Sequence, residues 1–81
     1  AIGAIKALKI RGHKIPEDIA VIGFDNISES RIIDPSLTTV DIPRKFMGQT
    51  AACQLIKQLV CPVPHTVKIE VSTTLVKRFS V

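Results

Sequence analysis

The spacing of hydrophobic residues alternates along this chain between a helical period and unbroken runs, which predicts helices alternating with strands. The first apolar residues recur about every 3.6 positions, as in an amphipathic helix. Gly12 suits the left-handed residue that follows a helix, so this helix is predicted to end near Arg11. The run Ile19–Phe24 leaves no polar face and predicts a strand covered on both sides, as in a parallel sheet flanked by helices. The apolar positions of the first helix are Ala1, Ile2, Ala4, Ile5 and Leu8.

The next part of the chain predicts a turn region followed by a short strand. Asn26–Arg31 is expected to form a loop or a short helix with Ser28 as its N-cap, and Pro35 is expected to stop it. Leu37–Val40 contains mostly β-branched residues, which favour a strand.

A second long helix is predicted to begin at Asp41 and Pro43 and to end before Pro62. Proline suits a first helical turn, and an acid there meets the positive end of the helix dipole. Gly48 inside this helix costs roughly 1 kcal/mol relative to alanine. It therefore suggests a close approach of another backbone, with a plain loss of stability as the alternative. The apolar stripe of this helix consists of Met47, Ala51, Leu55, Ile56 and Leu59.

The end of the chain predicts two further strands. Apolar and polar residues alternate over Val67–Val71, the pattern of a strand with one open face. Leu75 and Val76 indicate a last short strand, and the charged residues Lys77 and Arg78 follow it.

The composition bounds the size of the fold. With 81 residues, of which 46% are hydrophobic and only 4% aromatic, the chain makes at most one small domain with an aliphatic core. Cys53 and Cys61 lie too far apart along one predicted helix to bridge, so they are interpreted as reduced thiols among apolar neighbours. No apolar run approaches the roughly 18 residues of a membrane span. We expect neither a membrane partner nor a signal peptide in this sequence.

A net charge of +4 raises the question of a nucleic-acid partner. The basic residues before Glu17 fall on the solvent side of the first predicted helix, and no aromatic residues are interleaved with them for base stacking. No helix-turn-helix or zinc pattern is present. A solvated basic face is therefore favoured over a DNA contact. These basic residues are Lys6, Lys9, Arg11 and Lys14.

Asp25 is the candidate ligand contact, because it follows the buried run directly and ligands of parallel α/β sheets bind outside the carboxyl ends of the strands. A carboxylate there accepts two charge-assisted hydrogen bonds from hydroxyls, and capping of the following turn is the alternative. No catalytic residue, metal or cofactor is predicted. His13 and His65 have no acidic or cysteine partner at metal spacing, and Glu17 and Asp18 lie at the other end of the strand.

Four motifs follow one another along the chain: Gly12-x-x-Ile15-Pro16 through Gly23-Phe24-Asp25-Asn26, Pro35-x-Leu37-Thr38-Thr39-Val40, Met47-Gly48, and Leu75-Val76-x-Arg78-x-Ser80. Together they resemble the C-terminal part of a lactose-repressor (LacI/GalR) family transcription regulator. The resemblance implies an α/β fragment of a two-lobed periplasmic-binding-protein-like fold, with parallel sheets flanked by helices. Residues 1–41 and 75–81 resemble elements of the C-terminal lobe, residues 42–74 resemble elements of the N-terminal lobe, and the DNA-binding domain is absent from this sequence.

The same resemblance implies binding residues. Asp25, with its neighbours Phe24 and Asn26, is expected to line an effector cleft between the lobes. Arg44 is expected there too, with a solvated arginine at a helix start as the alternative. Dimerisation is expected through the first helix and the segment before the Leu37 strand, with burial of two isoleucines in the chain's own core as the alternative. The expected dimer residues are Ile2, Lys6, Ile32 and Ile33.

The resemblance thus implies the effector-binding and dimerising segment of a cytoplasmic bacterial repressor, and not an enzyme. Its small-molecule effector is expected to be a sugar or sugar phosphate, and its other partners a second copy in a homodimer and, through a separate N-terminal domain, operator DNA. A periplasmic sugar-binding transport protein of the same fold is the alternative, and a small enzyme is a more distant one. An upstream helix-turn-helix would indicate the regulator and a signal peptide the transport protein.

Overall fold

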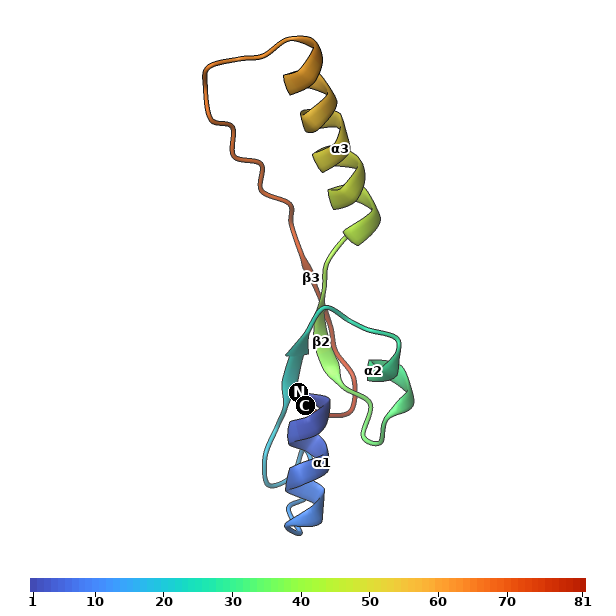
Figure 1. Ribbon diagram of the computed structural model, residues 1–81. Helices are drawn as coiled ribbons and strands as arrows, with labels where there is room; N and C mark the ends of the chain where they lie inside the picture. Colours follow the sequence, from blue (N-terminus) through green and yellow to red (C-terminus); the bar gives the residue numbers. More distant parts are fainter. The chain divides into compact units, whose positions relative to one another are not determined.

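The computed structural model describes residues 1–81 and contains three helices and three strands (Figure 1). The chain divides into two compact units, one formed by residues 1–42 and 73–81 and the other by residues 43–72. The first unit holds α1, β1, α2, β2 and β3, and the second holds α3. In chain order the elements are α1 (Ile2–Ile10), β1 (Ile22–Phe24), α2 (Glu29–Ile32), β2 (Thr38–Asp41), α3 (Arg44–Val60) and β3 (Thr74–Val76).

The strands form one small sheet with the order β1-β2-β3. β1 runs parallel to β2, with Gly23 opposite Thr39, and β3 runs antiparallel to β2, with Leu75 opposite Val40. The sheet is therefore mixed, and the predicted α/β fold class is confirmed. Because β1 and β2 are parallel, their carboxyl ends lie at the same edge of the sheet.

The strand predicted over Ile19–Phe24 is shorter than expected. Only Ile22–Phe24 pairs with β2, whereas the backbone N–H of Val21 donates to the carbonyl of Ser80. β1 is an edge strand, and the side chains of Ile22 and Phe24 are 57% and 63% exposed. Cover on both sides was the wrong expectation for this chain, because the face of β1 that carries Ile22 and Phe24 is left uncovered.

The core of the first unit is small and centres on Ile5 of α1 and Leu37, both 3% exposed. β1 passes close to it, since a Cβ at Gly23 would lie 2.7 Å from Leu37 Cδ2. A glycine in the strand therefore permits the close approach. At the end of α1, Gly12 has a φ of 84°, which confirms the predicted left-handed residue.

The short helix predicted in the turn region is present as α2. Ser28 stands at its N-cap position, but its hydroxyl donates to Glu29 Oε2 at 3.1 Å and makes no capping hydrogen bond. The predicted side-chain cap is thus wrong, because the adjacent carboxylate offers a charged acceptor. α2 ends at Ile32, before Pro35 as predicted.

α3 is the helix of the second unit, with Pro43 at its N-cap position. Its first turn contains no acidic residue because Asp41 is the last residue of β2, so the predicted contact of Asp41 with the helix dipole is wrong. α3 ends at Val60, before Pro62 as predicted. No residue of α3 is buried, and its predicted apolar stripe is exposed.

Two other expectations for this helix also differ from the structure. The thiols of Cys53 and Cys61 are free but exposed, and so are not packed among apolar neighbours. Beyond its chain neighbours and the adjacent backbone of α3, no atom lies within 4 Å of a Cβ placed at Gly48, so this glycine does not mark a close approach of another segment. Both expectations assumed that α3 is covered, and the second unit supplies no cover.

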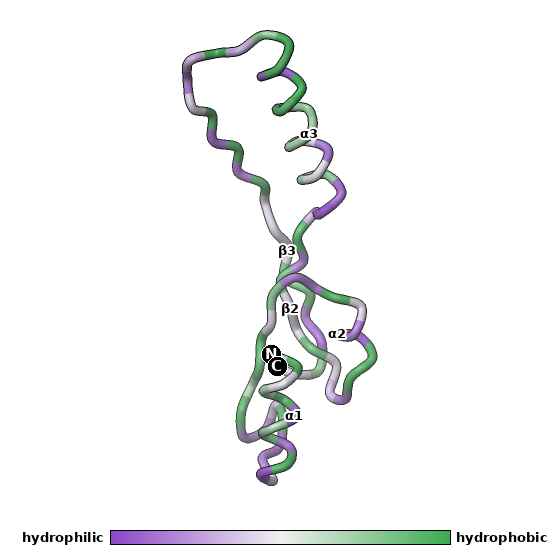
Figure 2. The backbone as a smooth tube through the Cα atoms, viewed as in Figure 1, coloured by the Kyte–Doolittle hydropathy of each residue, from purple (hydrophilic) through white to green (hydrophobic).

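The strand predicted over Val67–Val71 is not formed. Figure 2 shows apolar and polar residues alternating along the segment after α3. The ammonium of Lys68 lies 2.9 Å from Glu70 Oε1, as expected for alternate residues of an extended chain. A strand also needs a neighbour for its backbone hydrogen bonds, and α3 is the only other element of this unit.

Ser80 ties the C-terminal segment into the first unit. Its side chain is fully buried; the hydroxyl accepts from the Thr38 backbone N–H at 2.7 Å and donates to the Val21 carbonyl at 2.6 Å. We expect Ser80→Ala to lower the free energy of unfolding by about 1–2 kcal/mol, because a buried backbone N–H and a part-buried carbonyl lose a partner. Urea unfolding of the whole protein measures this change. The exposed Ser72→Ala is the control, and equal midpoints for the two variants would contradict the prediction.

Candidate functional site

The edge at the carboxyl ends of β1 and β2 carries the candidate site. β1 ends at Phe24, and Asp25 and Asn26 follow with φ values of 88° and 47°. Asparagine and aspartate tolerate left-handed backbone better than other residues with a Cβ. Asp41 ends β2 at the same edge. These residue types therefore permit the chain to turn sharply just after the apolar strand.

Asn26 is held by three hydrogen bonds. Its backbone N–H donates to Thr39 Oγ1 at 3.1 Å, and its Nδ2 donates to Asp41 Oδ1 at 3.0 Å. Its Oδ1 accepts from Arg78 Nη2 at 2.9 Å. Both ends of the Asn26 amide are thus engaged inside the first unit, so this residue anchors the turn.

Asp25 continues the pairing of β1 with β2, since its backbone N–H donates to the Val40 carbonyl at 2.9 Å. Its side chain is exposed, and so is that of Phe24 beside it. A carboxylate and an aromatic ring are therefore presented on neighbouring residues at the edge where ligands of open α/β sheets bind.

Arg44 lies in the second unit, as the first residue of α3, and it is exposed. The helix-start position expected for this residue is confirmed. Asp25 belongs to the first unit and Arg44 to the second, so a shared effector cleft stays a prediction.

Three of the four residues expected at a dimer interface line one groove of about 350 Å³. Ile2 and Lys6 come from α1, and Ile33 follows α2. Ile32 is 80% exposed, whereas Ile33 is half-buried. Ile32 therefore does not belong to the core of this chain. The groove residues are Ile2, Ile5, Lys6, Lys9, Ile10, Ile33 and Asp34.

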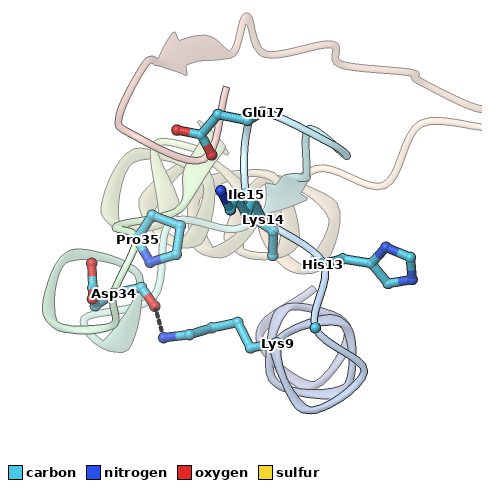
Figure 3. Close-up of a pocket in the computed structure, with 8 residues that line it drawn as sticks. Lys9, His13, Lys14, Ile15, Glu17, Asp34 and Pro35 are labelled. Atoms are coloured by element: carbon cyan, nitrogen blue, oxygen red, sulfur yellow. Dashed lines mark hydrogen bonds between the residues drawn. The ribbon is translucent and has the colours of Figure 1, made fainter.

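A second hollow, of about 360 Å³, lies beyond the end of α1 (Figure 3). Lys9 Nζ donates across it to the Asp34 carbonyl at 2.8 Å, and Glu17 and His13 also line it. Basic and acidic groups are thus mixed here. Lys6, Lys9, Arg11 and Lys14 are all exposed, as expected for the solvent side of the chain.

The structure contains no group of three or more His, Cys, Asp or Glu side chains that could hold a metal ion. The helices are also too short or too polar for any of them to span a membrane.

Sequence reasoning missed two residues that shape the candidate site. Asp41 was assigned to a helix start and Arg78 to a charged tail, yet both bind the Asn26 side chain. The available signal was the Arg78-x-Ser80 motif.

Comparison with known proteins places this geometry in context. The whole chain, residues 1–81, matches the model of the periplasmic binding protein-like domain. The HTH-type transcriptional repressor PurR of Erwinia tasmaniensis is 41% identical over 81 residues, which are 100% of this chain and 24% of that protein. The chain therefore spans about a quarter of the length of the curated relatives it matches.

Solved structures agree with the sequence match. A LacI family transcriptional regulator from Enterococcus faecium with bound ribose is 36% identical, with a TM-score of 0.82, over 96% of this chain and 29% of that one. The lac repressor dimer bound to operator and the anti-inducer ONPF is 29% identical, with a TM-score of 0.87, over 99% of this chain and 28% of that one.

Proposed function

Since the chain belongs to the periplasmic binding protein-like family and matches the C-terminal part of LacI/GalR transcription regulators, we propose that it forms a segment of the effector domain of a bacterial repressor. The family predicted from the four sequence motifs is thereby confirmed. The observation that carries the functional proposal is Asp25, an exposed carboxylate on a left-handed residue directly after the parallel strand β1.

We propose that the effector carries hydroxyl groups and is a sugar or sugar phosphate. A carboxylate binds two adjacent hydroxyls through charge-assisted hydrogen bonds, and Phe24 beside it offers an apolar face. The ribose bound by the Enterococcus faecium relative supports this class of ligand. In this proposal Asp25 and Phe24 contact the effector, Asn26 holds the turn, and Arg44 lines the cleft from the other lobe.

The proposed lobes correspond to the two units of the chain. The first unit, with β1, β2 and β3, is assigned to the C-terminal lobe, and the second unit, with α3, to the N-terminal lobe. The division at residues 42 and 73 supports this assignment. An effector that contacts both lobes favours one relative setting of them, which is the basis of the proposed allosteric control of DNA binding.

A homodimer is part of the same proposal. Ile2, Lys6 and Ile33 line one groove, and Ile32 is exposed next to it in the sequence. Exposed isoleucines beside an apolar groove suit a protein interface better than solvent. The dimeric state of the lac repressor structure supports the formation of a dimer.

The test is a DNA-binding assay on the whole protein, as its gene encodes it. Genomic fragments that the protein retains are first selected, and their affinity is then measured by gel shift with and without D-ribose or cellobiose. These are the sugars in the Enterococcus faecium structure and in a similar transcriptional regulator CelR-cellobiose complex. We expect the sugar to change that affinity by roughly 5- to 150-fold, the usual range of allosteric coupling. Sugar binding by a protein that selects no DNA fragment would instead support the transport-protein alternative.

A further inference from the structure

Arg78 reaches from the C-terminal segment to the residue that follows Asp25. Its Nη2 donates to Asn26 Oδ1 at 2.9 Å, and its Nη1 donates to the Leu37 carbonyl at 2.8 Å. Its backbone N–H donates to Thr38 Oγ1 at 2.8 Å. The Arg78 backbone N–H and its Nη1 are both hydrogen-bonded at the start of β2. These two bonds fix the direction in which Nη2 points.

The Asn26 amide fits these surroundings in one orientation. Its Oδ1 faces the guanidinium of Arg78, which has only donors, and its Nδ2 faces the Asp41 carboxylate at 3.0 Å. A reversed amide would set donors against donors and an oxygen against an oxygen. The three side chains form a row from a positive to a negative group, in which each hydrogen bond strengthens the next.

The middle member of this row, Asn26, directly follows Asp25 in the chain. Asp25 and Asn26 both have positive φ values, a conformation that residues with a Cβ keep only when surrounding contacts hold it. The backbone N–H groups of the two residues bind Val40 and Thr39 of β2. The Asn26 side chain, held by Arg78 and Asp41, supplies two further contacts.

We propose that Arg78 is a positioning residue for the candidate effector site: by binding the Asn26 amide, it maintains the left-handed turn that sets the direction of the Asp25 carboxylate. The inference rests on the proposed function for what the site binds. The positioning itself concerns only contacts within the first unit, so it is measured without a ligand.

The test is residue-resolved amide hydrogen exchange on the whole protein. In Arg78→Met the amides of Asp25 and Asn26 are expected to exchange about tenfold faster, because the local opening of the turn becomes easier. The amides of α1 and α3 are expected to keep their rates. Lys77→Met is the matched control, since Lys77 is exposed and the substitution removes the same charge from the neighbouring residue. Rates equal to those of this control, or a uniform acceleration throughout the first unit, would overturn the proposal.

Two further variants test the route through Asn26. In an Asn26→Gly background, Arg78→Met is expected to add little to the exchange rates, because both substitutions break the same contact. Arg78→Lys is the milder change and replaces Arg78→Met in these measurements if that variant fails to fold. It is expected to give intermediate exchange rates, since lysine reaches one acceptor where arginine reaches two. Full additivity, or Arg78→Lys rates equal to those of the Lys77→Met control, would contradict action through Asn26.

Titration with D-ribose separates this inference from the proposed function. Where the wild type binds D-ribose, Arg78→Met is expected to weaken binding about tenfold, and unchanged affinity together with faster exchange would overturn the positioning role. Where the wild type binds neither D-ribose nor cellobiose, the sugar proposal fails, and the exchange rates still decide whether Arg78 holds the turn.

Discussion

Expressed alone, the 81-residue chain is expected to self-associate or to bind a hydrophobic dye, and to lack a cooperative unfolding transition. Only Ile5 and Leu37 are buried apolar side chains, whereas 18 large hydrophobic side chains are exposed. Burying apolar surface stabilises a fold by about 25 cal/mol per Å², and the net free energy of unfolding of a domain is only about 5–15 kcal/mol. The apolar surface that stays exposed here therefore forfeits most of the stabilisation that a domain needs. α3 contributes no buried residue at all.

Size-exclusion chromatography with light scattering, dye fluorescence and thermal circular dichroism measure this behaviour. The whole protein is the first control, and it is expected to unfold cooperatively. A double substitution on the exposed face of α3, Leu55→Lys with Leu59→Lys, is the second, and it is expected to reduce both dye binding and association of the isolated chain. A monodisperse monomer that melts sharply without binding the dye would show that these 81 residues fold independently.

The parts of the fold that the sequence predicted correctly are those set by local signals. The end of α1 depends on Gly12, whose missing Cβ permits the positive φ observed there. The helix over Arg44–Val60 depends on an apolar period and on Pro62 beyond its end. The last strand, at Leu75 and Val76, depends on a short apolar run. Each of these signals acts between residues that are close in the sequence, so it can be interpreted without a partner.

The parts that were wrong depend on what lies beside a segment. Val67–Val71 has the alternation of a strand but no neighbouring strand. A longer β1 would need Val21 to pair with β2, but the backbone N–H of Val21 donates to the Ser80 carbonyl instead. Hydrophobic periodicity indicates which face of a segment is to be covered. It does not indicate whether the cover is present in the same chain.

The candidate site divides in the same way. The position of Asp25 at a strand end was predictable, because an apolar run that ends in a carboxylate marks the edge of a sheet. Its left-handed backbone and the hydrogen bonds to the Asn26 side chain were not predictable, because they depend on Asp41 and Arg78. Arg78 lies 52 residues from Asn26 in the sequence, and no local pattern links the two.

Asp25→Ala is expected to weaken sugar binding by the whole protein by roughly 2 kcal/mol or more, a loss of about 30-fold in affinity. The reason is that the variant loses charge-assisted hydrogen bonds between the carboxylate and the hydroxyls of the sugar that covers it. Isothermal titration with D-ribose or cellobiose, whichever the wild type binds, measures the loss. Unchanged affinity would remove Asp25 from the site.

Two further substitutions separate the loss of the carboxylate from strain in the turn. Alanine at a φ of 88° is strained, whereas Asp25→Gly is not, so the glycine variant is expected to be more stable than the alanine variant by about 1 kcal/mol. Asp25→Asn keeps the shape and the tolerance of left-handed backbone but loses the charge. If the carboxylate itself binds the sugar, Asp25→Gly and Asp25→Ala lose affinity equally despite their different stabilities, and Asp25→Asn loses part of it. An affinity that instead followed unfolding stability across the three variants would show that Asp25 acts through the turn and not through contact with the sugar.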